Sequence, residues 1–306
     1  MSKTVSINSK EFLAPTFIGV GAQKCATTWL SECLRRHPEI FMSSPKEIHF
    51  FVGKHWETKS VEWYLEYFKN SDQYKVAGEF SPSYLVMPEV PERIKNVCGQ
   101  VKILISIRNP THRFISHYKM CMRNKSLSKE KFHLLNIENY HKATKLVPEL
   151  LINGSYYQGI KNYIDTFGAE NVYIIIKEKI DKNPEKEISE LYKFLGVAPQ
   201  YAPSIITKKI NQTMVPRSTI LNNMRLKSAR ITKRRFPWII NYLRKFRIDE
   251  TLRRLNSEKG QFRFTVEDAV LNELNLYYMT EVANIQNLLG QSLDEWKFNL
   301  DQVQSN

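Results

Sequence analysis

One stretch of the chain decides the fold: Thr16-Phe17-Ile18-Gly19-Val20-Gly21-Ala22-Gln23-Lys24-Cys25-Ala26-Thr27-Thr28-Trp29-Leu30. Residues 16–21 are apolar or small, as in a short buried strand, and the apolar side chains from Thr27 to Arg36 recur at helical spacing. His37-Pro38 ends this helix, because the residue before a proline avoids helical backbone angles. A strand, a turn with glycine and lysine, and a helix in this order are typical of the opening of a phosphate-binding α/β domain.

Three later segments predict further strands, with helical segments between them. We expect strands at 75–80, 101–107 and 171–177, a helical run that follows Asn109-Pro110-Thr111 and continues to about Arg123, and a helix from about 156 to 167. Strands that alternate with helices favour a parallel sheet that is covered on both faces and has right-handed connections. The predicted fold class is therefore α/β, with a central parallel sheet flanked by helices in three layers.

The C-terminal part is expected to be mostly helical, with helices at 184–195 and 265–289. Within it, the span 225–254 carries 11 Lys and Arg residues against two acidic residues. We predict an N-terminal arm, residues 1–15, followed by a single domain, residues 16–306, that includes this basic helical segment.

Composition limits the class of protein. The 306 residues are 42% apolar and 25% charged, which excludes a disordered chain, a collagen-like fibre and a small disulfide-linked domain. The formal net charge of +14 favours an anionic ligand, but it does not choose among nucleic acid, anionic lipid, a nucleotide and an acidic polysaccharide.

The cysteines and the N-terminus indicate the compartment. The four cysteines form no C-x-x-C pair, which favours reduced thiols in the cytosol. Residues 1–15 lack the apolar run of an export signal, and no run of 18 apolar residues occurs. We expect a cytoplasmic protein without a membrane span.

The turn after the first predicted strand is the first candidate site. Lys24, Thr27 and Thr28 stand at a helix N-terminus, where free backbone N–H groups, the helix dipole and an ammonium group converge on a phosphate. The turn is not a Walker A loop, because the lysine precedes the hydroxyls by three and four residues.

The end of the predicted strand 101–107 is the second candidate site. Arg108 follows this strand directly, at the edge where open α/β sheets bind ligands. Ser116 lies eight residues further on, in the next helix. A guanidinium fork and a hydroxyl at these positions suit one phosphate group.

Five segments occur in an order that is informative as a set: Gly21–Leu30, Ser44–Phe51, Gly78–Tyr84, Arg108 with Ser116, and Leu288–Trp296. The chain thereby resembles the sulfotransferases that use 3′-phosphoadenosine-5′-phosphosulfate (PAPS), and within them the bacterial branch similar to heparan sulfate sulfotransferases. The first segment looks like the family's 5′-phosphosulfate loop, the second is similar to K-E-x-H-F-F, and the third to G-E-x-[ST]-P-x-Y. Arg108 and Ser116 look like its 3′-phosphate motif.

The resemblance implies a P-loop-kinase-like fold, a single sulfotransferase domain and a defined set of functional residues. Lys24 is expected to neutralise charge on the bridging oxygen without a metal, and Glu47 to act as general base, with His49 as the alternative base or the orienting partner. The expected nucleotide-binding residues are Gln23, Lys24, Cys25, Ala26, Thr27, Thr28, Trp29, Arg108, Ser116, Arg217, Lys259, Gly260 and Arg263.

One position departs from the family's pattern. Heparan-type enzymes often have a lysine after the glutamate of the G-E segment, where this chain has Phe80. Lys46 is the candidate to replace that positive charge.

Two other functions remain open from the residues. One is a P-loop nucleotide kinase or NTPase, but this chain lacks the Gly-Lys-[ST] sequence of such enzymes and an aspartate at the end of a second strand to bind magnesium. A nucleic-acid-binding protein would use the basic span 225–254, although no nucleic-acid motif is present. For a sulfotransferase, the acceptor is a hydroxyl or amine on a glycan, a glycolipid or a small natural product.

Overall fold

Five parallel strands form the central sheet in the order β4-β5-β3-β6-β8. These strands are β3 (Phe17–Gly21), β4 (Ile40–Met42), β5 (Val76–Phe80), β6 (Lys102–Ile107) and β8 (Val172–Ile176). β3 is buried along its whole length and β6 is buried from its second residue, as expected for strands covered on both faces. The predicted α/β class with a central parallel sheet is confirmed.

The structure is a computed structural model that describes residues 3–123, 134–206, 214–216, 257–259 and 264–296. The chain divides into two compact units, one of residues 1–208 with 265–306 and the other of residues 209–264. In the second unit, β9 (Met214–Pro216) pairs antiparallel with β10 (Ser257–Lys259). The basic span 225–254 lies outside the described residues.

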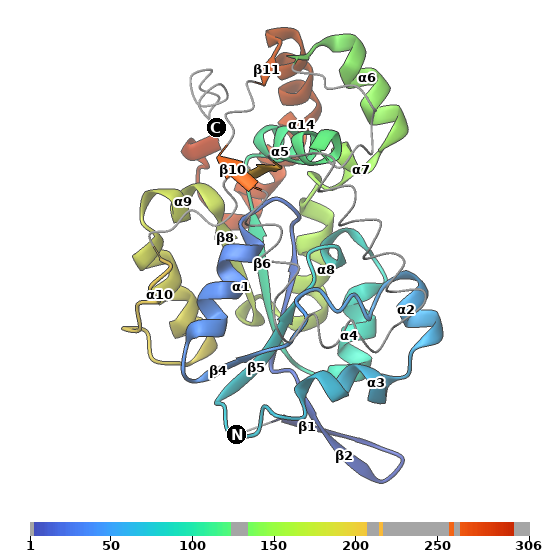
Figure 1. Ribbon diagram of the computed structural model, residues 1–306, viewed down its shortest axis with the longest axis vertical. Helices are drawn as coiled ribbons and strands as arrows, with labels where there is room; N and C mark the ends of the chain where they lie inside the picture. Colours follow the sequence, from blue (N-terminus) through green and yellow to red (C-terminus); the bar gives the residue numbers. More distant parts are fainter. Residues whose placement is uncertain (1–2, 124–133, 207–213, 217–256, 260–263, 297–306) are drawn as a thin grey trace. The chain divides into compact units, whose positions relative to one another are not determined.

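Helices cover both faces of the sheet (Figure 1). α1, α9 and α10 lie on one side, and α4 and α8 lie on the other. Their bounds are Thr27–Arg36 for α1, Lys177–Lys182 for α9, Pro184–Leu195 for α10, Val90–Cys98 for α4 and Tyr157–Phe167 for α8. This is the three-layer arrangement that the sequence predicts.

The remaining elements of the first unit are shorter or lie apart from the sheet. The helices are α2 (Gly53–Thr58), α3 (Val61–Leu65), α5 (Pro110–Arg123), α6 (Ile137–Leu146), α7 (Glu149–Ile152) and α14 (Asp268–Leu289). β7 (Leu134–Leu135) pairs parallel with β11 (Thr265–Val266), and four 3₁₀ turns lie at 66–68, 84–86, 169–171 and 294–296. The long α14 packs against α5 (Figure 1).

Two helices illustrate why the predicted boundaries agree with the structure. α1 buries Trp29, Leu30, Cys33 and Leu34 on one side and ends before Pro38. α10 begins at Pro184 after Asn183, whose side chain accepts a hydrogen bond from the Lys186 N–H, and it ends at Gly196 with φ 79°. An asparagine cap, a first-turn proline and a left-handed glycine are strong helix boundaries.

Residues 3–14 form an antiparallel hairpin of β1 (Lys3–Ile7) and β2 (Lys10–Ala14). Its two-residue turn, Asn8-Ser9, has φ angles of 48° and 63°, which match the twist of the flanking strands. The segment read from sequence as an arm is thus a regular element that precedes β3.

The strand order creates a switch point at β3. From β3 the chain proceeds to β4 and β5 on one side, and then to β6 and β8 on the other. Open α/β sheets bind ligands at the carboxyl ends of strands beside such a point. The segments that follow β3, β5 and β6 are therefore where a site is expected.

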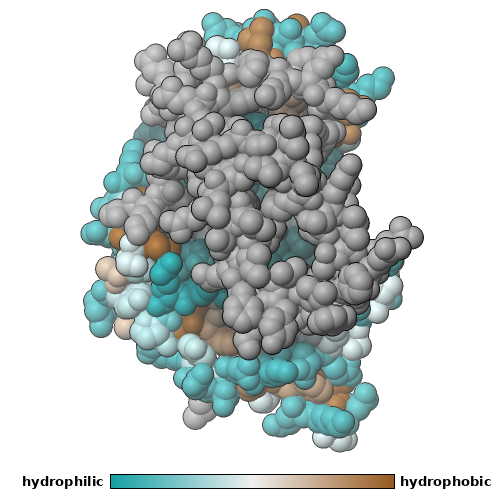
Figure 2. Space-filling view, in the orientation of Figure 1, coloured by the Kyte–Doolittle hydropathy of each residue, from teal (hydrophilic) through white to brown (hydrophobic). Residues whose placement is uncertain are grey.

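The visible surface of the described residues is mostly hydrophilic, with small hydrophobic groups between the polar side chains (Figure 2). Within the described part of the chain, no helix has the length and apolar character needed to cross a membrane.

Candidate active site

The turn after β3, residues 22–26, is fastened to the neighbouring strand β6 at both ends. The Ala22 N–H donates to the Ser106 carbonyl oxygen at 2.6 Å, and the Ser106 hydroxyl donates to the Cys25 carbonyl oxygen at 2.5 Å. Lys24 and Ala26 have left-handed φ angles of 71° and 61°, a backbone region that costs non-glycine residues energy. The turn is thus held in a compact, irregular shape.

Helix α1 starts directly after this turn, so its first N–H groups are available to a ligand. Thr27, Thr28 and Trp29 are its first three residues, and the first N–H groups of a helix have no acceptor within it. Trp29 is buried, so its side chain packs in the interior. Lys24 Nζ lies 3.7 Å from the sulfur of Met120 in α5.

The side chains of Cys25 and Gln23 connect the turn to residues 153–156. The Cys25 thiol lies 3.7 Å from the Tyr156 hydroxyl and is fully buried. Burial raises the pKa of the Cys25 thiol to about 11, so it stays protonated at neutral pH. The Gln23 side chain accepts a hydrogen bond from the Asn153 amide at 3.4 Å.

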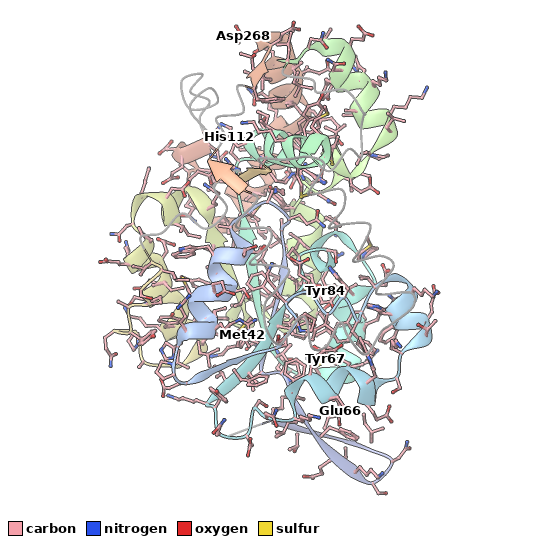
Figure 3. The ribbon with its side chains drawn as sticks, in the orientation of Figure 1. Met42, Glu66, Tyr67, Tyr84, His112 and Asp268 are labelled. Atoms are coloured by element: carbon pink, nitrogen blue, oxygen red, sulfur yellow. The ribbon has the colours of Figure 1, made fainter. Side chains whose placement is uncertain are left out.

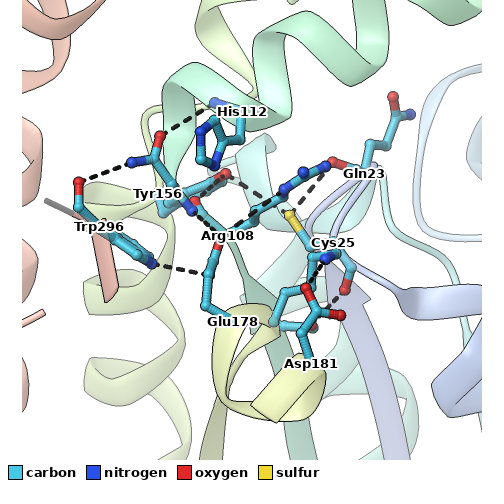
Figure 4. Close-up of polar contacts among 11 residues, drawn as sticks. Gln23, Cys25, Arg108, His112, Tyr156, Glu178, Asp181 and Trp296 are labelled. Carbon is cyan, nitrogen blue, oxygen red and sulfur yellow. Dashed lines mark hydrogen bonds and ion pairs between the residues drawn. The ribbon is translucent and has the colours of Figure 1, made fainter. Parts of the chain in front are cut away.

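Arg108, the residue after β6, faces a buried carboxylate. Its Nε lies 3.9 Å from Glu178 Oε1, and both side chains are largely buried, at 15% and 13% exposure. Glu178 also accepts hydrogen bonds from the Asn109 N–H at 3.1 Å and from the Trp296 indole N–H at 3.0 Å (Figure 4). Burial raises the pKa of Glu178, while Arg108 opposes that shift.

Two buried nitrogen atoms at and beside Arg108 have no hydrogen-bond partner among the described residues. They are Arg108 Nε and His112 Nε2. Burial first, and then Arg108 and Lys177, lower the pKa of His112 to about 4. Ser116 lies on α5, two turns after the start of the helix, and is partly buried. Because buried polar atoms are normally paired, the orphaned guanidinium nitrogen of Arg108 fits an anionic group bound here, and His112 Nε2 fits the same group in the tautomer in which it carries the ring proton.

The loop between β4 and α2 carries Glu47 and His49. The Glu47 N–H donates to the carbonyl oxygen of Phe80, the last residue of β5, at 3.2 Å. The Glu47 carboxylate accepts a hydrogen bond from Lys46 Nζ at 2.7 Å, and its other oxygen lies 3.4 Å from His49 Nε2. The hydrogen bond from His49, and then that from Lys46, lower the pKa of Glu47 to about 2. Glu47 is therefore a carboxylate at neutral pH.

The His49 ring is held on both sides. Its Nδ1 lies 2.9 Å from the Ser83 hydroxyl, and its Nε2 faces Glu47. Its backbone, like that of Glu47, is left-handed, with φ angles of 53° and 66°. The pair is thus fixed by contacts with the segment that follows β5.

Phe80 is fully buried, and its ring packs against the backbone of Gly19 in β3 so closely that a Cβ on Gly19 would overlap it. The position where heparan-type relatives often have a lysine is therefore part of the interior here. Lys46 brings a positive charge to Glu47 instead.

The structure brings most of the sequence-predicted residues to the carboxyl edge of three adjacent strands. The turn with Lys24 follows β3, Arg108 follows β6, and the Glu47 loop is fastened to the end of β5. Lys259 lies in β10, and its side chain is not described. Arg217, Gly260 and Arg263 lie outside the described residues.

Glu178, Trp296 and Glu79 are absent from the residues proposed from sequence. Glu178 stands two residues after β8, so its place after a buried strand was the available signal. In the sequence, Glu79 occurs within the Gly78–Tyr84 motif and Trp296 ends the Leu288–Trp296 motif, but neither motif indicates a role for that side chain. Among the described side chains, no group of three or more His, Cys, Asp or Glu could hold a metal ion.

Relatives of known sequence resemble part of the chain. Heparan sulfate glucosamine 3-O-sulfotransferase 5 of Mus musculus is 30% identical over 189 residues, which cover 61% of this chain and 54% of that protein. Bifunctional heparan sulfate N-deacetylase/N-sulfotransferase 4 of Mus musculus is 28% identical over 201 residues, 61% of this chain and 23% of that protein. This chain thus spans about half the length of the first relative and about a quarter of the second.

A solved structure has the same fold. A sulfotransferase from Alicyclobacillus acidocaldarius superposes with a TM-score of 0.64 at 22% identity, over 93% of this chain and 99% of that one. This likeness confirms the P-loop-kinase-like arrangement of the sheet and helices.

The family described as the sulfotransferase domain matches residues 15–270, which is most of the chain. This match confirms the resemblance to the sulfotransferases that the sequence motifs indicate, and it favours a sulfotransferase over a P-loop kinase or a nucleic-acid-binding protein. The chain belongs to the sulfotransferase domain family.

Proposed function

We propose that this protein transfers the sulfuryl group of PAPS to a hydroxyl or amine of an acceptor by in-line displacement. The observation that carries the proposal is the meeting of three segments at one sheet edge: the Lys24 turn after β3, Arg108 after β6, and the Glu47 loop held at the end of β5. A cationic turn, a buried arginine and a carboxylate are the three groups that this chemistry requires.

The turn and Arg108 would hold the two phosphate-bearing ends of the donor. N–H groups at the start of α1, with the Thr27 and Thr28 hydroxyls, suit the 5′-phosphosulfate. Arg108, whose Nε has no hydrogen-bond partner among the described residues, suits the 3′-phosphate together with Ser116. The groups that the protein offers are thus rich in N–H and O–H donors, as a polyanionic ligand requires.

Lys24 is the proposed electrostatic catalyst. As the bond from sulfur to the phosphate oxygen breaks, negative charge develops on that oxygen. A fixed ammonium stabilises developing charge and typically contributes about 10²- to 10³-fold in rate. Adenosine 3′,5′-bisphosphate is then the leaving group and the second product.

Glu47 is the proposed general base and His49 its orienting partner. The attacking hydroxyl or amine must lose a proton as its bond to sulfur forms, and a carboxylate at neutral pH can take it. Both ring nitrogens of His49 already face protein atoms, Ser83 Oγ and Glu47 Oε2. His49 therefore fits the role of fixing the carboxylate better than that of taking the proton.

A glycan, a glycolipid or a small natural product is the proposed class of acceptor. The relatives are named for activity on heparan sulfate, which favours a glycan as the first acceptor to test. We further propose that residues 16–306 act as one sulfotransferase domain in the cytoplasm. The four cysteines are free and buried, as suits a reducing compartment.

Transfer of labelled sulfate tests the function directly. The protein is incubated with sulfur-labelled PAPS and an extract of its own host, and labelled products are identified. We expect a labelled product together with adenosine 3′,5′-bisphosphate, in the presence of a metal chelator as well as without it. Release of labelled inorganic sulfate alone, or no binding of adenosine 3′,5′-bisphosphate in calorimetry, would contradict the proposal.

A further inference from the structure

Glu79 is a carboxylate in the interior of the protein that the proposed reaction does not use. It lies in β5, with 0% exposure, and it accepts three hydrogen bonds. Tyr64 and Tyr84 donate their hydroxyls to Oε1 at 3.1 and 3.3 Å, and Ser81 donates its hydroxyl to Oε2 at 2.7 Å. Burying a carboxylate is costly unless such donors surround it, so this position calls for a reason beyond packing.

Two of its three donors continue to the loop that carries Glu47 and His49. The Ser81 oxygen accepts the backbone N–H of His49 at 3.2 Å, and the Tyr84 oxygen accepts the backbone N–H of Phe51 at 3.4 Å. Tyr84 lies on the side of the sheet that carries α3 and α4 (Figure 3). One carboxylate is thus connected through two hydroxyls to two N–H groups of the same loop.

The direction of these hydrogen bonds follows from the loop's backbone. The N–H groups of His49 and Phe51 can only donate, so they take lone pairs of the Ser81 and Tyr84 oxygens, whose own protons point to Glu79. Burial raises the pKa of Glu79, and the hydrogen bonds from Ser81, Tyr64 and Tyr84 oppose that shift. In Glu79→Gln, the amide NH₂ group would donate to one of these hydroxyls, which could then no longer donate to residue 79.

The loop needs such a fixation because its backbone is irregular. Glu47 and His49 are both in the left-handed region, with φ angles of 66° and 53°. Residues in this region persist only where the surroundings hold them. Ser81 holds the N–H of His49, whose ring in turn contacts Glu47.

We propose that Glu79 is a positioning residue for sulfuryl transfer, which sets the place of Glu47 and His49 through the hydroxyls of Ser81 and Tyr84. This inference rests on the proposed function, since it takes Glu47 as the base. It assigns Glu79 no contact with the donor or the acceptor.

Four single variants test it: Glu79→Gln, Ser81→Ala, Tyr84→Phe and, as matched control, Tyr64→Phe. Tyr64 donates to the same Glu79 oxygen as Tyr84, but its hydroxyl does not accept a backbone N–H of the loop as those of Ser81 and Tyr84 do. Its ring packs on Phe50 and Phe51 at 4.7 and 5.0 Å, and Tyr64→Phe keeps this packing while it removes the hydroxyl. Displacement of a reacting group by about 1 Å costs up to about 10²-fold, so we expect Glu79→Gln and Ser81→Ala to lower kcat about 10- to 100-fold. Tyr84→Phe, whose contacts are longer, should lose less. Affinity for adenosine 3′,5′-bisphosphate should not change in any of them.

The pH dependence of kcat separates positioning from stability. Where the loop is loosened, His49 moves from Glu47, and the pKa of Glu47 rises from about 2 towards its ordinary value of 4.5. As the pH is lowered, kcat of Glu79→Gln and Ser81→Ala should then begin to decrease at a higher pH than kcat of the wild type. Tyr64→Phe loses one buried hydrogen bond and should have a lower melting temperature, but its kcat and pH profile should stay those of the wild type.

Hydrogen exchange of residues 46–51 gives a readout that does not need activity. We expect faster exchange of the His49 amide in Glu79→Gln and Ser81→Ala, and wild-type exchange in Tyr64→Phe. If the wild type transfers no sulfate, the proposed function fails while this measurement still decides the fixation of the loop. If Glu79→Gln does not fold, Ser81→Ala and Tyr84→Phe carry the test. Wild-type kcat and exchange in folded Ser81→Ala, or an equal loss of kcat in Tyr64→Phe, would overturn the inference.

Discussion

Glu178 Oε1 lies 3.9 Å from Arg108 Nε, and the same carboxylate accepts hydrogen bonds from the Asn109 backbone and the Trp296 indole. The two residues stand at the carboxyl ends of neighbouring strands, β6 and β8, and are 70 positions apart in the chain. The carboxylate therefore links the arginine of the candidate donor site to the segment after α14.

Removing the Trp296 donor should weaken this link measurably. Trp296→Phe keeps an aromatic ring but leaves one oxygen of the buried Glu178 without its indole partner. Loss of a hydrogen bond to a charged group costs about 1.5–3 kcal/mol. We therefore expect the free energy of unfolding, measured in urea, to be lower than that of the wild type by this amount. An unchanged unfolding midpoint would show that the indole N–H makes no net contribution.

Arg108→Ala should abolish the preference for PAPS over the analogue that lacks the 3′-phosphate. Arg108 is expected to contact a part of the donor that does not react, so its loss acts mainly on donor binding. The comparison of kcat/KM for the two donors measures the effect, and Ser116→Ala should show a smaller one. If the preference survives in Arg108→Ala, the 3′-phosphate is bound elsewhere, with Arg217 or Arg263 as the next candidates.

Lys24→Ala should lower the rate of labelled-sulfate transfer by about 10²- to 10³-fold, because it removes the cation nearest the developing charge. It should also weaken binding of adenosine 3′,5′-bisphosphate. Lys69→Ala is the control, since Lys69 is exposed and paired with Glu66 away from the sheet edge. Near-normal turnover of Lys24→Ala would place Lys24 outside the site.

Gly19→Ala should destabilise the protein, because a methyl group on Gly19 would overlap the buried Phe80 ring. Overpacking of this kind costs about 1–3 kcal/mol. The smaller side chain of Phe80→Leu should recover part of that loss when the two substitutions are combined. Thermal unfolding of the two single variants and the double variant measures the recovery, and strictly additive losses would contradict the contact.

Much of the fold was accessible from sequence because its central elements are buried on both faces. The strand at β6 and the helices α1 and α10 were placed to within a residue, since apolar runs and strong helix boundaries mark them. β4 was missed, because the three residues Ile40–Met42 become a strand only by pairing with β5. The hairpin of residues 3–14 was read as an arm, since its alternation is mostly polar and its strands pair only with each other.

The residues of the candidate site are likewise of two kinds: those in local sequence motifs, and those brought together by the fold. Lys24, Glu47, His49, Arg108 and Ser116 stand in short motifs, so the sequence could name them. The contacts of Glu178 with Arg108 and of Ser81 with His49 join residues 70 and 32 positions apart. Such pairings come from the strand order and carry no local pattern, and for this reason the supporting residues were found only in the structure.

Glu47 is the proposed general base, and its titration in the folded protein can be tested through the pH dependence of stability. His49 and then Lys46 hold the pKa of Glu47 near 2, below its ordinary 4.5. Because the folded value is the lower one, the pairing stabilises the protein above about pH 4.5 and this contribution is lost as the pH falls towards 2. Glu47→Gln should therefore show a weaker loss of stability over that interval than the wild type.

The most direct test of the central claim is to measure kcat and the affinity for adenosine 3′,5′-bisphosphate on Glu47→Gln, with His49→Asn as the paired variant. The amide keeps the size of the side chain but takes no proton, so we expect unchanged affinity and a kcat lowered by about 10²- to 10⁴-fold. We expect a smaller loss for His49→Asn, which removes only the orienting contact. A dominant loss at His49 with a mild one at Glu47 would assign the base to the histidine, and full activity of both variants would contradict the placement of the acceptor beside residues 46–51.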